Sequence, residues 1–251
     1  MSLTLASDLS LPGHADAMAL AGTEYDRLAV LARDLQGDDW SRPTDCTLWD
    51  VRALLAHNLG NMESNASLRV MAHQITTAKK RAKVAGTQMI DELTALQVAE
   101  RADLAPDDLV RRLAAVVGPA LAGRRRVPAP LRRLVRLEAP PPLTSMTLGY
   151  LNDHVYTRDM WMHRVDICRA TGRDVMVDDD HDRRVVATIV CDWAAGHGAD
   201  FDLTLAGPAG GSYRRGEGGE ELQLDAVEFC RIVSGRNPAA ASGLLATGVL
   251  F

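Results

Sequence analysis

Apolar side chains recur at helical spacing through most of the chain before residue 195, and this periodicity constrains the fold more than any other feature. In residues 14–36, Ala21, Leu28 and Leu35 fall on one side of a helix because a turn takes 3.6 residues, and Gly37 ends the run. We predict further helices over residues 48–73, 74–101, 107–121, 145–171 and 179–195.

The pattern changes after residue 198. FDLTLAG alternates apolar and polar residues as a strand does, and two short strands, SYRRG and ELQL, follow between glycine-rich turns. The closing GLLATGVLF is expected to form a strand or a docked tail. We therefore predict a mainly α protein with a helical domain over residues 1–198 and a small α+β domain over residues 199–251.

Two capping patterns mark predicted helix starts. Thr47, three residues before Asp50, is expected to cap the helix that follows, and Asp225 with Glu228 forms a D-x-x-E cap near the C-terminus.

One connection is rich in proline and arginine. GRRRVPAPLRRLVRLEAPPPL contains five prolines, which favour an extended path over the surface. Its arginines could bind an anion, although a solvated basic face is typical of such charge runs. They are Arg124, Arg125, Arg126, Arg132, Arg133 and Arg136.

Composition excludes several classes of protein. A net charge of −5 does not favour nucleic acid, and no apolar run approaches the roughly 20 residues that span a bilayer. The first residues lack the basic start of a signal peptide, so we expect a cytoplasmic protein without membrane partners. The four cysteines form no C-x-x-C pair and are expected to be reduced and mostly buried. They are Cys46, Cys168, Cys191 and Cys230.

The segment YTRDMWMHRVDICRATG places polar groups inside an otherwise apolar helix. Asp159, His163 and Asp166 share one narrow stripe of it. A metal site in a helical bundle needs donors from at least two helices, and His57 in LLAHNLG is the candidate from another helix. The alternative is that His57 is an ordinary core histidine and that the acid–histidine pair only steadies its helix.

Three segments resemble the mycothiol-dependent maleylpyruvate isomerase family of the DinB-like superfamily: RPTDCTLWDVRALLAHNLG, RDMWMHRVDICRATGRD and GLLATGVLF. The resemblance runs from about residue 14 to the C-terminus. It implies a DinB-like four-helix bundle followed by a small C-terminal α+β domain, with mycothiol as the thiol and usually zinc as the metal. The implied metal ligands fall on His57, Asp159 and His163. The polar stretch 74–101 fits this pattern poorly.

Two details bear on the implied site. The isomerase has glutamate where this chain has Asp159, and the shorter side chain requires the metal to sit closer to this helix. Asp166 could accept the imidazole N–H that the metal does not use, which would orient His163. The alternative is a salt bridge from Asp166 to Arg169 or Arg173.

Three protein ligands would leave one zinc position open for the thiol. The thiolate could add to an electron-poor double bond and leave after rotation, which is cis–trans isomerisation of a maleylpyruvate-like molecule. It could instead be transferred to an electrophilic small molecule, as in an S-transferase. A binding module without turnover, or a regulatory bundle that forms a homodimer, also stays open. The sequence contains no G-x-S-x-G, phosphate-loop or dinucleotide motif. Candidates to hold a substrate carboxylate are Arg214, Arg215, Arg231 and Arg236, although solvation at the surface is the more typical role of such residues.

Overall fold

The computed structural model describes residues 3–251, and their contacts group into two compact units. The sheet unit comprises residues 3–20, Pro130–Met162 and Val175–Phe251, and the bundle unit comprises Ala21–Ala129 and His163–Asp174. Helices α1 (His14–Arg33) and α8 (Tyr156–Thr171) contribute residues to both.

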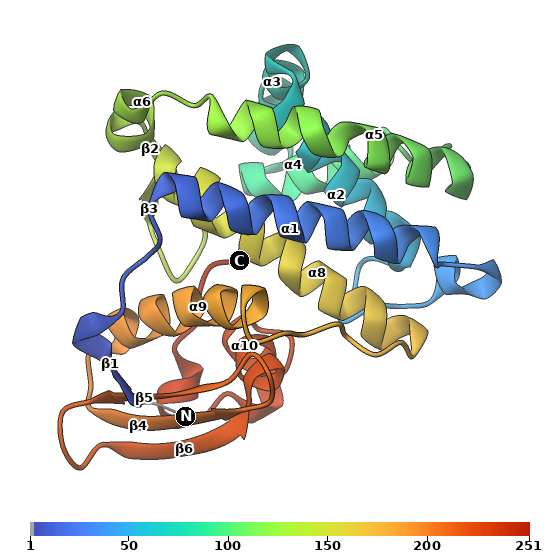
Figure 1. Ribbon diagram of the computed structural model, residues 1–251. Helices are drawn as coiled ribbons and strands as arrows, with labels where there is room; N and C mark the ends of the chain where they lie inside the picture. The colour runs from blue at the N-terminus through green and yellow to red at the C-terminus, as the bar shows by residue number, and fades with distance from the viewer. Residues whose placement is uncertain (1–2) are drawn as a thin grey trace. The chain divides into compact units, whose positions relative to one another are not determined.

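Four further helices make up most of the bundle unit: α2 (Val51–Ala66), α3 (Leu68–Ala85), α4 (Met89–Ala99) and α5 (Pro106–Arg125). Helix α2 packs against α3, α4 and α5 (Figure 1). Buried polar pairs add to this packing, because Arg164 of α8 binds Glu24 of α1 at 2.6 Å and Arg124 donates to the Tyr25 hydroxyl at 3.0 Å. The apolar core of this unit includes Leu28, Leu54, Leu55, Leu59, Leu109 and Leu113.

The predicted helix over 48–73 is in fact two helices. Asp50, and not Thr47, caps α2, because the Asp50 carboxylate accepts the backbone N–H of Ala53. Helix α2 ends at Ala66, and Ser67 caps the start of α3. A serine can hydrogen-bond a free backbone N–H, and so it can begin a new helix inside a continuous apolar pattern.

The prediction that residues 74–101 are helical is confirmed for most of that range by α3 and α4. Gly86 ends α3 with a left-handed backbone, φ 71°, which a glycine adopts without strain.

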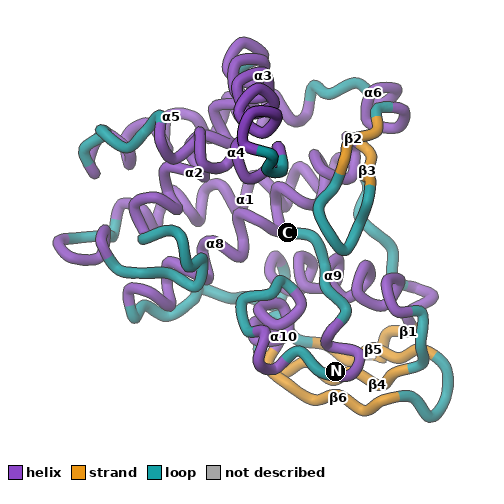
Figure 2. The backbone as a smooth tube through the Cα atoms, turned by 180° about the vertical axis from the view of Figure 1, so that it is seen from behind, coloured by secondary structure: helices purple, strands orange, loops and turns teal. Residues whose placement is uncertain are grey.

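In the sheet unit, β4 (Phe201–Ala206) is central. It pairs antiparallel with β5 (Gly211–Arg215) and parallel with β6 (Glu220–Asp225). The three strands predicted after residue 198 are therefore confirmed. An unpredicted strand, β1 (Leu3–Leu5), pairs parallel with β5, so the sheet order is β1-β5-β4-β6 (Figure 2).

Two helices pack with this sheet, α9 (His181–His197) and α10 (Ala226–Val233). Trp193 of α9 contacts the rings of Phe201 on β4 and Phe229 on α10. The predicted Asp225 cap is confirmed, because its carboxylate accepts the N–H groups of Val227 and Glu228.

The C-terminal segment is a docked tail. Its backbone N–H at Val249 donates to the Val233 carbonyl at 2.9 Å, and the Leu244 carbonyl accepts the Trp193 indole N–H at 3.0 Å.

The region 123–155 departs from prediction. The expected extended connection contains the end of α5, helix α6 (Ala129–Leu134) and strand β2 (Arg136–Glu138). Strand β3 (Ser145–Thr147) pairs with β2, so the helix expected from residue 145 starts only at α7 (Leu148–Tyr150). Proline is compatible with the first turn of a helix, which explains why Pro130 does not prevent α6.

A π-helical segment (Leu151–Val155) joins α7 to α8. The remaining short elements are 3-10 turns at Ala6–Asp8, Gly37–Ser41, Pro238–Ala240 and Gly243–Ala246.

The predicted fold class, mainly helical with a small α+β part, is confirmed. The domain limits at 1–198 and 199–251 stay a prediction. Within residues 3–251, no helix combines the length and apolar character needed to cross a bilayer.

Candidate metal centre

Two imidazoles meet inside the bundle unit. His57 lies on α2 among buried leucines, and His163 lies on α8. Their ring centroids are 5.3 Å apart in an edge-to-face arrangement, and both side chains are buried. The tertiary structure therefore brings together two histidines that lie more than a hundred residues apart in sequence.

The loop before α2 covers these rings. Trp49 stacks on His57 with ring centroids 5.0 Å apart, and its ring lies 6.3 Å from that of His163. Two interactions join the ends of this loop. The Thr44 hydroxyl donates to the Trp49 carbonyl at 2.8 Å, and Pro43 forms an isolated antiparallel β-bridge with Asp50. A tight turn thus holds an aromatic wall beside the two imidazoles.

The third predicted ligand lies on the same helix as His163. Asp159 is four residues earlier on continuous α8, so its carboxylate is one helical turn away. His57, Asp159 and His163 each offer one ligand atom, and these atoms lie within 4.8 Å of one another. Two imidazoles and one carboxylate form a donor set typical of catalytic zinc, so the residues present fit such an ion.

The other side of His163 has its own partners. Asp166 Oδ2 lies 3.2 Å from His163 Nδ1, and the Cys46 thiol donates to the same oxygen at 3.5 Å. Arg169 binds Asp45 and Arg173 binds Asp39, so each of the two arginines considered as partners of Asp166 has another carboxylate beside it. Asp166 is therefore placed to accept the Nδ1 proton of His163.

Cys46 and Trp49 were not predicted as part of the site. Cys46 Sγ lies 3.8 Å from His163 Nδ1, and Cys46, His163 and Asp166 form a second group whose donor atoms lie within 4.8 Å. The available signal was the sequence DCTLWD, which places a thiol and an indole directly before the helix that carries His57. The turn residues around them indicated only a loop.

The four arginines proposed to hold a substrate carboxylate all belong to the sheet unit. Arg214 binds Asp202, Arg215 donates to the Ala194 carbonyl, and Arg231 binds Glu228. These contacts give the three guanidinium groups partners within the protein, and Arg231 is buried rather than solvated at the surface.

All four cysteines are free thiols, but only Cys168 and Cys230 are buried, whereas Cys46 and Cys191 are partly exposed. Burial raises the pKa of the Cys168 and Cys191 thiols, and it also raises the pKa of the fully buried Cys230. These three thiols are therefore protonated at neutral pH and poor nucleophiles.

A family model described as the mycothiol maleylpyruvate isomerase N-terminal domain matches residues 21–168. Among solved structures, the crystal structure of the mycothiol-dependent maleylpyruvate isomerase is similar, with a TM-score of 0.58 and 17% identity over 93% of this chain and 92% of that one. A mutant of that isomerase gives a TM-score of 0.57 and 15% identity over the same shares of the two chains. At these identities the structures support the fold alone. No curated protein matches.

Proposed function

Because this chain belongs to the mycothiol maleylpyruvate isomerase N-terminal domain family, we propose that it is a metal-dependent enzyme that uses mycothiol on a small electrophilic molecule. The favoured reaction is cis–trans isomerisation of a maleylpyruvate-like substrate. The observation that carries the proposal is the meeting of His57, Asp159 and His163, whose donor atoms lie within 4.8 Å of one another.

The donor set supports zinc as the metal. Two neutral imidazoles and one carboxylate leave a single negative charge and an open fourth position. When bound there, a zinc ion would lower the pKa of a coordinated thiol enough to deprotonate it at neutral pH. Mycothiol would then supply the sulfur that adds to an electron-poor double bond and leaves after rotation.

The neighbouring residues orient and shield these groups. Asp166 Oδ2 lies 3.2 Å from His163 Nδ1, which favours a proton on Nδ1 and leaves the lone pair of Nε2 for a metal. Trp49 covers one face of His57 and limits the access of water to that ring. Because the pKa values of Cys168, Cys191 and Cys230 are raised, an added thiol is the better nucleophile than any of these three.

A second candidate is S-transfer from mycothiol to an electrophile. It is favoured by Asp159, which is one methylene shorter than the glutamate that the family resemblance implies. A non-catalytic metal-binding module is the third candidate, and a homodimer stays a prediction.

The test combines metal analysis with a thiol-consumption assay. Purified protein should contain about one equivalent of zinc or a similar ion, and His57→Ala should lose it. The matched control is His73→Ala, which removes an exposed histidine of α3 bound to Glu100 and should leave the metal content unchanged.

Isomerisation would need mycothiol without consuming it, whereas transfer would deplete it in proportion to product. Metal retained by the His57→Ala variant would contradict the proposed ligand set. If the metal-loaded protein binds no mycothiol or related thiol, the enzymatic proposal is wrong and the binding module takes its place.

A further inference from the structure

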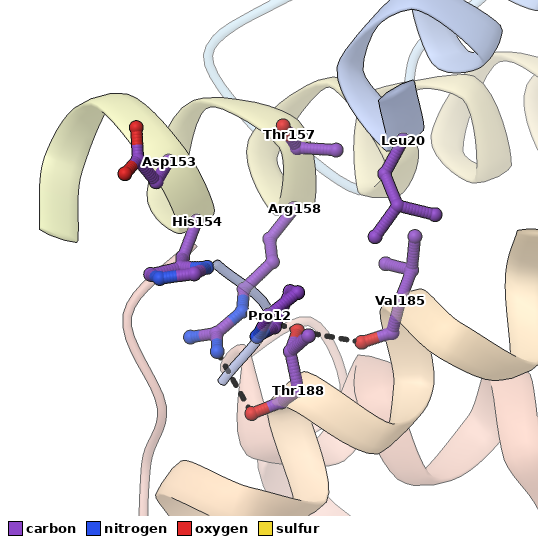
Figure 3. Close-up of a pocket in the computed structure, with 8 residues that line it drawn as sticks. All are labelled: Pro12, Leu20, Asp153, His154, Thr157, Arg158, Val185 and Thr188. Atoms are coloured by element: carbon purple, nitrogen blue, oxygen red, sulfur yellow. Dashed lines mark hydrogen bonds between the residues drawn. The ribbon is translucent and has the colours of Figure 1, made fainter. Parts of the chain in front are cut away.

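The sheet unit contains a second candidate site. A pocket of about 370 Å³ opens between α6 and the α7 region, within the size range of small-molecule sites. A neighbouring cavity, lined by Pro12, Arg158 and Thr188 among others, has a volume of only about 10 Å³ (Figure 3). That cavity has room for no more than about one water molecule, so of these two spaces the larger pocket is the one that can hold a ligand.

Two guanidinium groups line the larger pocket. Arg132 and Arg133 contribute to its wall beside the imidazole of His154, and no carboxylate does so. Arg132 binds Asp153 at 3.0 Å, which fixes its guanidinium group. Arg133 is exposed, and within residues 3–251 the structure gives it no ion pair or side-chain hydrogen bond. The pocket therefore presents a guanidinium group whose charge is not neutralised by the protein.

An apolar wall faces the same space. It is formed by Leu11 and by the ring of Tyr150. The Tyr150 hydroxyl donates to Asp192 at 2.6 Å, and burial raises its pKa to about 12. The hydroxyl is thus neutral and already engaged, and the fixed ring offers a flat surface beside the arginines.

The backbone around the pocket is closely held. A Cβ atom on Gly149 would lie 2.9 Å from the Arg132 carbonyl oxygen, so this glycine permits α6 and α7 to approach. The Leu148 N–H donates to the Val135 carbonyl at 2.9 Å, and Arg136 of β2 pairs with Thr147 of β3. The segment that contains Arg132 and Arg133 is therefore held by backbone contacts against the neighbouring residues 147–149.

The pocket is separate from the predicted metal ligand on the same helical run. His154 lies in the π-helical segment and lines the pocket, whereas Asp159 lies in α8 and is not part of its lining.

We propose that this pocket binds a small organic anion, a carboxylate or phosphate monoester on a flat apolar group, through Arg133 and Arg132 with Tyr150 and Leu11 against the apolar part. A guanidinium group matches the geometry of both anions, and an aromatic ring accommodates the flat part of the ligand. This site depends on neither the metal nor the thiol of the proposed reaction.

The test is calorimetric titration of the full-length protein with phenyl phosphate, benzoate and the neutral benzyl alcohol. One saturable site for phenyl phosphate or benzoate is expected, with much weaker binding of benzyl alcohol. The stronger of the two anions identifies the head group as phosphate or carboxylate.

Arg133→Gln should weaken anion binding about fivefold or more, because it removes a charge-assisted contact without breaking an ion pair of the protein. Arg136→Gln is the matched control: it removes an exposed arginine of the adjacent strand that does not line the pocket, and affinity should change less than about twofold. Circular dichroism establishes that both variants fold.

Three results would overturn the proposal. They are the absence of saturable binding at millimolar anion, equal binding of benzyl alcohol, and equal weakening by the two substitutions, which would indicate general attraction to the basic surface.

Discussion

Asp166 is completely buried, and one of its carboxylate oxygens lies near both the His163 imidazole and the Cys46 thiol. Burying a carboxylate is energetically costly unless hydrogen-bond donors surround it, so these two contacts stabilise Asp166 in its buried position. They hold the His163 ring in one orientation and favour a proton on Nδ1. The effect of Asp166 on a bound metal should therefore pass through His163.

Replacing Asp166 with asparagine keeps the size of the side chain but removes its charge. We expect Asp166→Asn to weaken zinc affinity by about 10- to 100-fold without abolishing binding. The measurement is competition with a chromophoric chelator.

Asp45→Asn is the control for this substitution. Asp45 is a partly exposed carboxylate next to Cys46 in the loop before α2, and its side chain binds Arg169. Zinc affinity that is unchanged in Asp166→Asn, or reduced equally in both variants, would mean that Asp166 does not act on the metal through His163.

At the scale of elements, close approaches between helices shape the bundle unit. A Cβ atom on Gly123 of α5 would overlap the Asn65 carbonyl oxygen of α2. A Cβ atom on Gly60 of α2 would lie 2.6 Å from the Gln97 side chain of α4. Glycines at these positions allow α2, which carries His57, to approach its neighbours more closely than larger residues would.

The substitution Gly123→Ala tests this packing. A methyl group there forces α2 and α5 apart, so we expect the free energy of unfolding to fall by about 1–3 kcal/mol. Ala115→Ser, at an exposed position of the same helix, should change it by about 0.5 kcal/mol or less. Denaturant unfolding at equilibrium measures both, and similar stabilities of the two variants would contradict the close contact.

Some polar residues of the segment 74–101 form buried hydrogen bonds between helices. Gln97 donates to Gln74 at 2.9 Å, and Gln74 donates to the Gly60 carbonyl at 3.1 Å, all in buried positions. Buried amides need such partners, and this chain of hydrogen bonds connects α4 and α3 to α2.

For the whole molecule, sequence order and spatial grouping differ. Strand β1, from the first residues, pairs with β5, and α9 belongs to the same compact unit as the sheet. Trp193 of α9 has its main ring contacts on Phe201 and Phe229, both beyond residue 198. A boundary at 198 would separate α9 from the surface that covers its indole.

Truncation after Gly198 therefore tests the predicted domain limit. The shortened chain keeps His57, Asp159 and His163 but exposes the apolar side of α9, so we expect a lower thermal midpoint, loss of solubility and loss of most activity. Thermal unfolding and size-exclusion chromatography of the metal-loaded protein give the comparison. A soluble truncated chain with an unchanged midpoint would establish residues 1–198 as an independent domain.

Local patterns in the sequence were sufficient for much of this fold. Period-3.6 apolar residues predicted the helices, alternation predicted β4, β5 and β6, and the D-x-x-E pattern predicted the Asp225 cap. The same periodicity placed Asp159, His163 and Asp166 on one stripe. These inferences succeeded because each depends on residues within a few positions of one another, where backbone geometry alone decides which side chains share a face.

The tertiary structure alone decided which distant segments meet. Three-residue β1, β2 and β3 are too short to carry a pattern, and each exists because a partner strand supplies its hydrogen bonds. Cys46 and Trp49 reach the imidazoles because a closed loop folds back on α2, and Arg133 lines a pocket because Gly149 lets two backbones approach. Contacts of this kind depend on the packing of segments far apart in the chain, and no local pattern in the sequence records them.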